Sequence, residues 1–191
     1  MRELMAGTTR KQASYLDLHD IPENVVGEIL NGELTAMLRP ARRCLHAASS
    51  LGAEIMPAYQ FGKGSGPGGW TVYHEPEVQL GENTVVPDLA AWKNASLVSL
   101  SPEARMDVAP DWVCEVLSPT TLRADKVRKM PIYARFGIPF LWLVNPLVKN
   151  LDVFALEAGR WTLTGSYSED DVVRAEPFQK IEIELRRLWI D

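Results

Sequence analysis

The sequence predicts a single domain of mixed α/β (α+β) class, built on a mixed β-sheet that is flanked by helices and extended by C-terminal β-hairpins. Three observations support this prediction. Helical periodicity occurs over residues 39–58 and 122–136, while shorter apolar runs lie between and after these stretches. The order strand, strand, helix, strand over residues 84–144 requires a crossover connection. The C-terminal third contains short strand-like runs separated by turn residues.

The composition is that of one globular domain. At 191 residues, of which 46% are hydrophobic, the chain can bury a large core without disulfide or metal support. Residues 1–13 are polar and are expected to be flexible, so the predicted folded domain covers residues 14–191. The sequence shows neither the apolar length of a membrane span nor a signal peptide, so we expect a soluble cytoplasmic protein without membrane contact. Cys44 and Cys114 are expected to be buried and reduced.

The first sixty residues predict a short helix, a hairpin and a long helix. A helix and a turn are expected over residues 15–24, and a hairpin over residues 27–37 that turns at Asn31-Gly32, the strongest short hairpin signal. Glu28 then lies on the first strand. The long helix is expected over residues 39–58 and to end in the fifties. Its predicted apolar face consists of Leu45, Ala48, Leu51 and Ile55. Its predicted end signals are Gly52 and Pro57.

Residues 61–69 are rich in glycine. A phosphate-binding loop would end in Gly-Lys-Ser/Thr and open a helix, whereas this segment leads into a predicted strand over residues 70–78. We therefore interpret it as a mobile loop.

Two runs read as buried strands, Thr84–Trp92 and Trp112–Leu117, and each has a carboxylate in its middle, Asp88 and Glu115. A carboxylate on an apolar strand costs several kcal/mol unless a cation, a hydrogen-bond network or a proton compensates it. Neighbouring strands lie about 4.8 Å apart, so the two acids could share one divalent ion. The alternative for each acid alone is an internal arginine or backbone amides as partners. For both acids together, a shared metal site is favoured.

A second Pro-Asp pair, Pro110-Asp111, competes with Pro87-Asp88 for this role. Asp111 and Glu115 share a strand face but lie about 13 Å apart along it, which is too far to ligate one ion. Asp111 is therefore expected to be a turn residue at the beginning of its strand.

The predicted helix over residues 122–136 follows the strand of Glu115, begins at Thr120 or Thr121 and ends at Gly137. Asp125, Lys129 and Tyr133 recur every fourth residue and share one face, either as a solvated salt bridge with a core aromatic or as part of a site. Pro131 predicts a kink or an early break.

The same helix is the most basic stretch of a chain whose net charge is −5. Because non-specific phosphate binding needs a surplus of basic residues, any nucleic-acid contact is expected to be local. The residues predicted to make this contact are Arg123, Lys126, Arg128 and Tyr133.

The rest of the chain predicts strands. A third apolar strand is expected over residues 140–144, where Asn145-Pro146 ends it. Hairpin strands are then expected over residues 151–156 and 161–163, joined by a turn at Ala158-Gly159, followed by strands over residues 172–173 and 181–185.

Several segments together resemble a known family. The segments "EILNGEL", "GPGGW", "EPEVQLGENTVVPDLAAW", "EVLSPTTLRADKVRKMPIYARFGIPFLWLVNP" and "LRRLW" are similar to the Uma-two family of putative restriction endonucleases, in the PD-(D/E)XK nuclease superfamily. The resemblance covers residues 15–189. It implies a restriction-endonuclease-like core in which Asp88 and Glu115 bind Mg²⁺, or Mn²⁺, and Glu28 is an auxiliary acid. One position departs from the superfamily motif, which has lysine where this chain has Leu117, and Lys129 on the following helix is the implied substitute.

The first hypothesis for function is metal-dependent hydrolysis of nucleic acid, with Asp88, Glu115, Lys129 and Glu28 as catalytic residues. DNA is the expected substrate, although the sequence does not distinguish DNA from RNA. The second is a non-catalytic module that keeps the nuclease fold for binding or dimerisation, which Leu117 and the negative net charge favour. A zinc hydrolase using His19, His46 and His74 is a third and weaker hypothesis, because their spacing matches no zinc motif. A homodimer is expected, since nucleases that cut duplexes often act in pairs.

Overall fold

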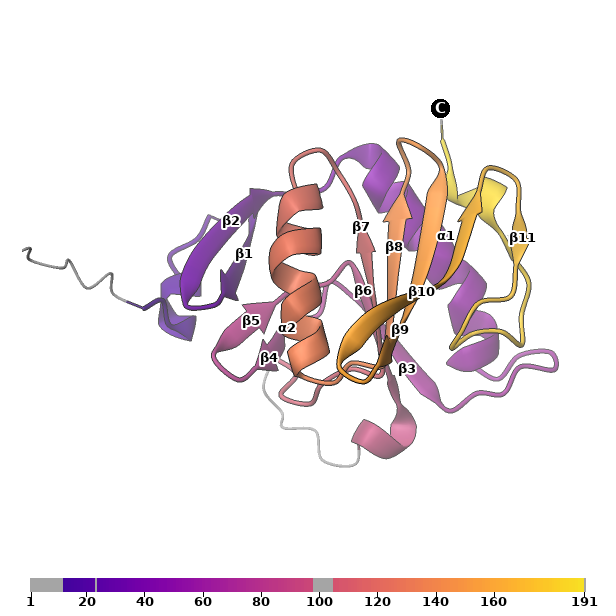
Figure 1. The fold of residues 1–191 in the computed structure, drawn as a ribbon, viewed down its shortest axis with the longest axis horizontal. Helices are drawn as coiled ribbons and strands as arrows, with labels where there is room; N and C mark the ends of the chain where they lie inside the picture. Colours follow the sequence, from indigo (N-terminus) through magenta and orange to yellow (C-terminus); the bar gives the residue numbers. More distant parts are fainter. Residues whose placement is uncertain (1–11, 23, 98–104, 191) are drawn as a thin grey trace, which may run out of the picture.

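The computed structural model describes residues 12–22, 24–97 and 105–190, and the following description concerns these residues (Figure 1). Most of the predicted polar N-terminal segment, residues 1–11, lies outside them. The helical elements are η1 (Tyr15–Leu18), α1 (Arg42–Tyr59), η2 (Asn94–Leu97), η3 (Ala124–Lys129), α2 (Met130–Arg135) and η4 (Leu185–Leu188). The strands are β1 (Val25–Leu30), β2 (Glu33–Leu38), β3 (Trp70–His74), β4 (Val78–Leu80), β5 (Asn83–Val85), β6 (Leu89–Lys93), β7 (Trp112–Val116), β8 (Phe140–Asn145), β9 (Asn150–Glu157), β10 (Arg160–Ser168), β11 (Val172–Val173) and β12 (Ile183–Glu184).

The central layer is a six-stranded mixed sheet with the order β10-β9-β8-β7-β6-β3. β7 and β8 are parallel, and η3 and α2 form the crossover between them, as the sequence predicted. The sheet has two cores, one on each face. α1 packs on the face of Trp112 and Cys114, and α2 packs on the opposite face, that of Val113. No helix in the described residues is long and apolar enough to cross a membrane.

A second sheet, with the order β2-β1-β5-β4, begins with the predicted hairpin. Asn31 and Gly32 both have positive φ, 54° and 77°, which is the requirement of a type I′ turn and the reason that Asn-Gly is favoured there. This confirms the predicted hairpin and places Glu28 on β1, with its side chain fully buried. In Figure 1 the hairpin lies beside α2.

Helix α1 occupies nearly the predicted range and ends at Tyr59, with Pro57 in its last turn. Gly52 does not end it. A Cβ at Gly52 would lie 2.7 Å from the imidazole of His74, so glycine allows this ring to pack closely against α1. Leu45, predicted on the apolar face, is 47% exposed; the buried face instead uses Cys44 and Ala47.

The prediction of one strand over Thr84–Trp92 was wrong. β5 ends at Val85 and belongs to the smaller sheet, whereas β6 begins at Leu89 and belongs to the central sheet. Pro87 lies in the link and has no N–H to donate to a strand ladder, which favours a break at this position. The predicted strand over residues 70–78 divides in the same way at Glu75-Pro76. Asp88 consequently lies where the chain passes from one sheet to the other.

The predicted helix over residues 122–136 is helical, but its first part is a π-helix. Residues 124–129 form η3, and the N–H of Met130 donates to the carbonyl of Asp125, five residues earlier. Pro131 has no N–H to donate to the preceding helical turn. Single π-helical turns of this kind often occur at functional sites. Pro131 therefore perturbs the helix without ending it.

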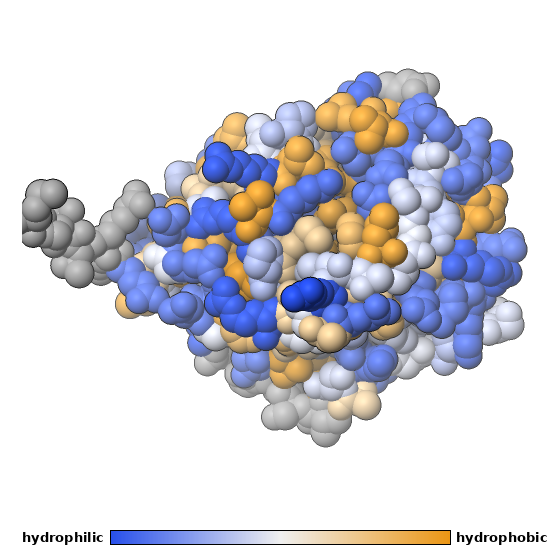
Figure 2. Space-filling model, in the orientation of Figure 1, coloured by the Kyte–Doolittle hydropathy of each residue, from blue (hydrophilic) through white to orange (hydrophobic). Residues whose placement is uncertain are grey.

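The C-terminal third consists of the predicted strands. β9 and β10 form a hairpin that turns at Ala158-Gly159, both with positive φ, and β10 extends well beyond the predicted residues 161–163. β11 pairs with β12, and the predicted strand over residues 181–185 is shorter than expected because η4 begins at Leu185. On the face that carries α2, Figure 2 shows hydrophobic patches separated by hydrophilic areas.

Candidate active site

The two acids predicted from the sequence lie side by side. β6 and β7 are antiparallel neighbours with Leu89 opposite Cys114, so the register continued by one residue sets Asp88 opposite Glu115. The Asp88 carboxylate accepts a hydrogen bond of 2.7 Å from the N–H of Val116. Asp88 is half-buried, whereas Glu115 is 1% exposed.

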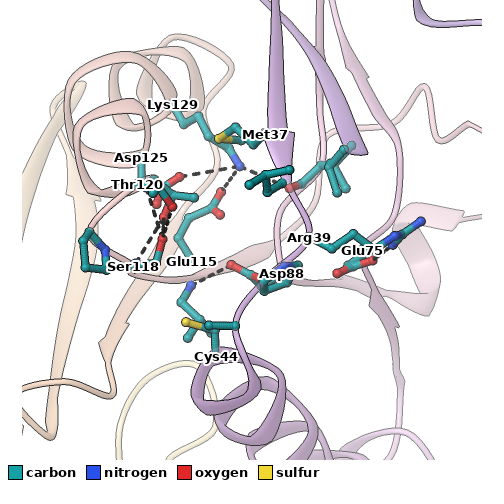
Figure 3. A pocket seen from close by; sticks show the side chains of 18 of the residues that line it. Met37, Arg39, Cys44, Glu75, Asp88, Glu115, Ser118, Thr120, Asp125 and Lys129 are labelled. Carbon is teal, nitrogen blue, oxygen red and sulfur yellow. Dashed lines mark hydrogen bonds and ion pairs between the residues drawn. The ribbon is translucent and has the colours of Figure 1, made fainter. Parts of the chain in front are cut away.

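Glu115 projects from the face of β7 that α2 covers (Figure 3). Its Oε1 lies 2.8 Å from the Lys129 ammonium and also accepts a short hydrogen bond from the hydroxyl of Tyr133. Both partners come from the helix that follows β7. Each acid thus has one of the compensating partners expected for a buried carboxylate, a backbone amide for Asp88 and an internal cation for Glu115.

Lys129 is the centre of a buried cluster and is 1% exposed. Besides Glu115, its Nζ lies 2.9 Å from Oε1 of Glu28 and 3.9 Å from Oδ1 of Asp125, and it donates to the carbonyl of Val86 at 3.2 Å. The structure therefore brings Lys129 to the acids, although it lies outside the strand that carries Glu115.

Glu28 approaches the site from β1. Its Oε1 accepts a hydrogen bond of 2.7 Å from the N–H of Val86 as well as contacting Lys129. Its second oxygen, Oε2, is buried and has no hydrogen-bond partner among the described residues. In this arrangement Glu28 positions Lys129 and the link between β5 and β6.

Burial of these groups changes the pKa values of Asp88, Glu115 and Lys129. Burial raises the pKa of Asp88 to about 6, against the opposing effects of the Val116 hydrogen bond and the Lys129 charge. Burial also raises the pKa of Glu115 well above its ordinary value, and Lys129 opposes the rise. For Lys129, burial alone would lower the pKa, but Glu115 and Glu28 outweigh it and hold the pKa well above the usual range. Lys129 is therefore charged at neutral pH.

A pocket of about 480 Å³ opens beside these groups (Figure 3). Asp88, Glu115, Asp125 and Lys129 line one side of it. The remaining lining includes residues at the end of β2, at the start of α1, directly after β3 and in the turn after β7, among them Met37, Arg39, Cys44, Glu75, Ser118 and Thr120. None of these six residues was predicted to belong to a site. Thr120 carried a signal for a helix start but none for a pocket.

The basic residues of the helix separate into two groups. Arg123 and Lys126 are exposed, as a nucleic-acid contact requires. Arg128 is turned toward the hairpin, where it donates to Thr35 Oγ1 at 2.9 Å and to the Leu30 carbonyl at 2.7 Å. Tyr133 is fully buried against Glu115, so its ring cannot contact nucleic acid as the sequence suggested.

Replacing Arg128 with methionine is expected to lower the free energy of unfolding by about 1–3 kcal/mol, because the buried carbonyl of Leu30 loses its donor. Chemical denaturation measures this change. Arg123→Met is the control and should change stability by less than about 0.5 kcal/mol, since Arg123 is exposed. Equal effects of the two substitutions would show that Arg128 does not hold the hairpin.

The competing candidates lie elsewhere. Asp111 accepts a hydrogen bond of 2.8 Å from the N–H of Lys93 and one from Ser96, which confirms a turn role. Leu117 is buried in the core beneath α2.

Among the described residues, no three His, Cys, Asp or Glu side chains are arranged to hold a metal ion. The histidine hypothesis therefore has no support from the geometry. Cys44 and Cys114 are buried and unpaired, as predicted.

Comparison with known proteins agrees with the predicted fold. The model of the Uma2 family, described as "Putative restriction endonuclease", matches residues 13–187. A solved structure from Anabaena variabilis ATCC 29413, "a putative nuclease belonging to DUF820", superposes with a TM-score of 0.74 and 17% sequence identity, covering 92% of this chain and 97% of that chain. No curated protein matches the sequence. These findings confirm the predicted restriction-endonuclease-like α/β (α+β) fold.

Proposed function

This chain belongs to the Uma2 family of putative restriction endonucleases, and we propose that it hydrolyses phosphodiester bonds of nucleic acid with a divalent cation at Asp88 and Glu115. The observation that carries the proposal is the meeting of these two acids and Lys129 at one pocket. A charged lysine and paired acids beside an open cavity are groups that phosphodiester hydrolysis uses.

The residues present fit a magnesium ion. Mg²⁺ prefers oxygen ligands, keeps several waters, and is commonly held by one or two carboxylates together with substrate phosphate. Asp88, immediately before β6, and Glu115 on the adjacent β7 provide two carboxylates at the same height of the sheet. A site of this kind does not require a third protein side chain, so the lack of a three-residue metal cluster among the described residues agrees with it.

The bound ion would lower the pKa of a water molecule and stabilise charge on the phosphate. Asp88 and Glu115 would hold it, with Val116 fixing the Asp88 carboxylate and Tyr133 fixing that of Glu115. Lys129, charged and held by Glu28, would orient the attacking water or neutralise the phosphate. Arg123 and Lys126 would contact the phosphate backbone of the substrate. This assignment gives Glu28 a positioning role in place of the metal-binding role first expected.

Metal binding and hydrolysis should both weaken as the pH falls below about 6. A metal ion binds the carboxylate form, and the raised pKa of Asp88, about 6, means that this carboxyl takes up a proton in that range. The apparent dissociation constant for Mn²⁺ should rise by at least about tenfold per pH unit below pH 6. Calorimetric titration at pH 5, 6, 7 and 8 measures it. A flat profile would contradict the role of Asp88.

The direct experiment is cleavage of supercoiled plasmid DNA and of single-stranded DNA and RNA, with Mg²⁺, Mn²⁺ or EDTA. We expect metal-dependent cleavage of DNA by the wild type, and calorimetry should detect one ion site that is lost in Glu115→Gln. Wild-type protein that neither binds an ion nor cleaves any of these substrates would refute the proposal.

A second candidate function is a non-catalytic module that uses the nuclease fold for binding. The observation in its favour is that Glu115 already has Lys129 and Tyr133 as partners, which is sufficient for a purely structural acid. This candidate predicts no divalent site that depends on Glu115. The same calorimetric comparison therefore separates the two candidates.

We also propose that the protein acts on DNA as a homodimer. β10 is an edge strand of the central sheet and Leu163 on it is 53% exposed, which supports a pairing surface at the C-terminal hairpin. Light scattering during size-exclusion chromatography measures the mass, which is 21.3 kDa for one chain.

A further inference from the structure

The ammonium of Lys129 lies within a shell of oxygens from four different elements. Glu28 comes from β1, the Val86 carbonyl from the link between β5 and β6, Glu115 from β7 and Asp125 from η3. The four N···O distances range from 2.8 to 3.9 Å. Carboxylates and a backbone carbonyl are also the oxygen donors that bind hard divalent cations.

More acidic side chains than basic ones surround the Lys129 ammonium. Three carboxylates approach this single ammonium, all on side chains that are at most 3% exposed. In addition, Oε2 of Glu28 is buried without a hydrogen-bond partner among the described residues, on the same carboxylate that contacts Lys129. Buried carboxylate oxygens without partners are costly, and this shell contains more carboxylate oxygens than one ammonium can hydrogen-bond.

We infer that Lys129 is a built-in cation, occupying the position that a second divalent ion would take in a two-metal phosphodiesterase site. The ion proposed at Asp88 and Glu115 would be the first, and in that respect the inference rests on the proposed function. Two-metal sites use one ion on the attacking oxygen and the other on the leaving oxygen. In this chain a lysine supplies the second positive charge, so a single divalent ion is sufficient.

The distances agree with a shell sized for an ammonium. Contacts of 2.8–2.9 Å to Glu115 and Glu28 are hydrogen-bond lengths, whereas Mg²⁺ binds oxygen at about 2.0–2.1 Å and Ca²⁺ at about 2.3–2.6 Å. A central ammonium therefore keeps the three carboxylates too far apart to form a metal cluster, in agreement with the lack of such a cluster among the described residues. Removing the amine should allow them to close around an ion.

The test is the number of Mn²⁺ ions bound per chain, measured by calorimetry and by electron paramagnetic resonance of free Mn²⁺. Lys129→Ala should bind one ion more than the wild type, two in place of one. The double variant Lys129→Ala with Glu28→Gln should lose the additional ion. Lys63→Ala removes an exposed lysine in the loop before β3 and should bind the same number of ions as the wild type.

Folding is followed by circular dichroism in the same titration, because the variant without metal is expected to be unstable. Recovery of folding by Mn²⁺ supports the inference. The inference is overturned if Lys129→Ala gains no ion relative to the wild type, or stays unfolded at every Mn²⁺ concentration. If the wild type binds no ion that is lost in Asp88→Asn, the proposed function alone is contradicted. The role of Lys129 would still be decided by whether Lys129→Ala binds one ion more than the wild type.

Discussion

Replacing Asp88 with asparagine is expected to reduce metal-dependent cleavage by about 10³-fold or more. Charge stabilisation by a bound metal ion contributes several kcal/mol, and each 1.36 kcal/mol of barrier is a factor of ten in rate. Asparagine keeps an oxygen that can accept the hydrogen bond from the N–H of Val116, so this contact between the start of β6 and the end of β7 should remain intact. The loss is therefore a loss of ligand charge. Single-turnover cleavage at saturating Mg²⁺ measures it.

The chain contains a matched control for this substitution. Asp111 also follows a proline, also lies beside the central sheet, and accepts its hydrogen bond from the N–H of Lys93. Asp111→Asn should leave the cleavage rate within about twofold of the wild type, because Asp111 does not line the pocket. If both variants cleave at the wild-type rate, Asp88 is not a metal ligand.

Replacing Lys129 with methionine is expected to lower the free energy of unfolding at pH 7.5 by about 3–5 kcal/mol, the usual cost of removing one partner from a buried ionic group. Methionine has a similar length but leaves Glu28, Glu115 and Asp125 without their cation. Denaturation by urea, monitored by the fluorescence of the six tryptophans, measures the change.

The size of this loss should depend on pH in a defined direction. Burial raises the pKa of Glu115 and Asp125 in the folded protein. A carboxyl group whose pKa is raised by folding binds more protons in the folded protein than in the unfolded protein. Its contribution to stability is therefore greatest at low pH and is lost as the pH rises. The variant should therefore lose less stability relative to the wild type at pH 5 than at pH 8. The control Lys126→Met, on the exposed side of the same turn, should show neither effect.

Local signals in the sequence were sufficient for a large part of the fold. The Asn31-Gly32 turn, the apolar periodicity of α1, and the order of β7, helix and β8 each depend on neighbouring residues, and each was predicted close to its observed range. The meeting of Asp88 and Glu115 was also predicted from the sequence, although Asp88 lies immediately before β6 and not in the middle of a strand.

The remaining features depend on contacts between distant parts of the chain. The passage of residues 84–93 from one sheet to another is decided by which strands are available as partners, and Pro87 was the only local sign of it. Nothing near Glu28 indicates that its carboxylate meets Lys129, 101 positions later in the sequence. The contact of Arg128 with the hairpin was missed for a similar reason, since a surface role and a contact with the hairpin have the same local pattern.

The π-helical turn of η3 has a consequence for recognising relatives of this protein. The bond from the Met130 N–H to the Asp125 carbonyl spans five residues, and a chain with one residue fewer in this turn would make the same bond as an ordinary α-helical one. In such a chain, the residues equivalent to Asp125 and Lys129 would be three positions apart in place of four, and would still lie on one face of the helix. Motif searches that require Asp-x-x-x-Lys will miss such chains, whereas a pattern that also accepts Asp-x-x-Lys will retain them.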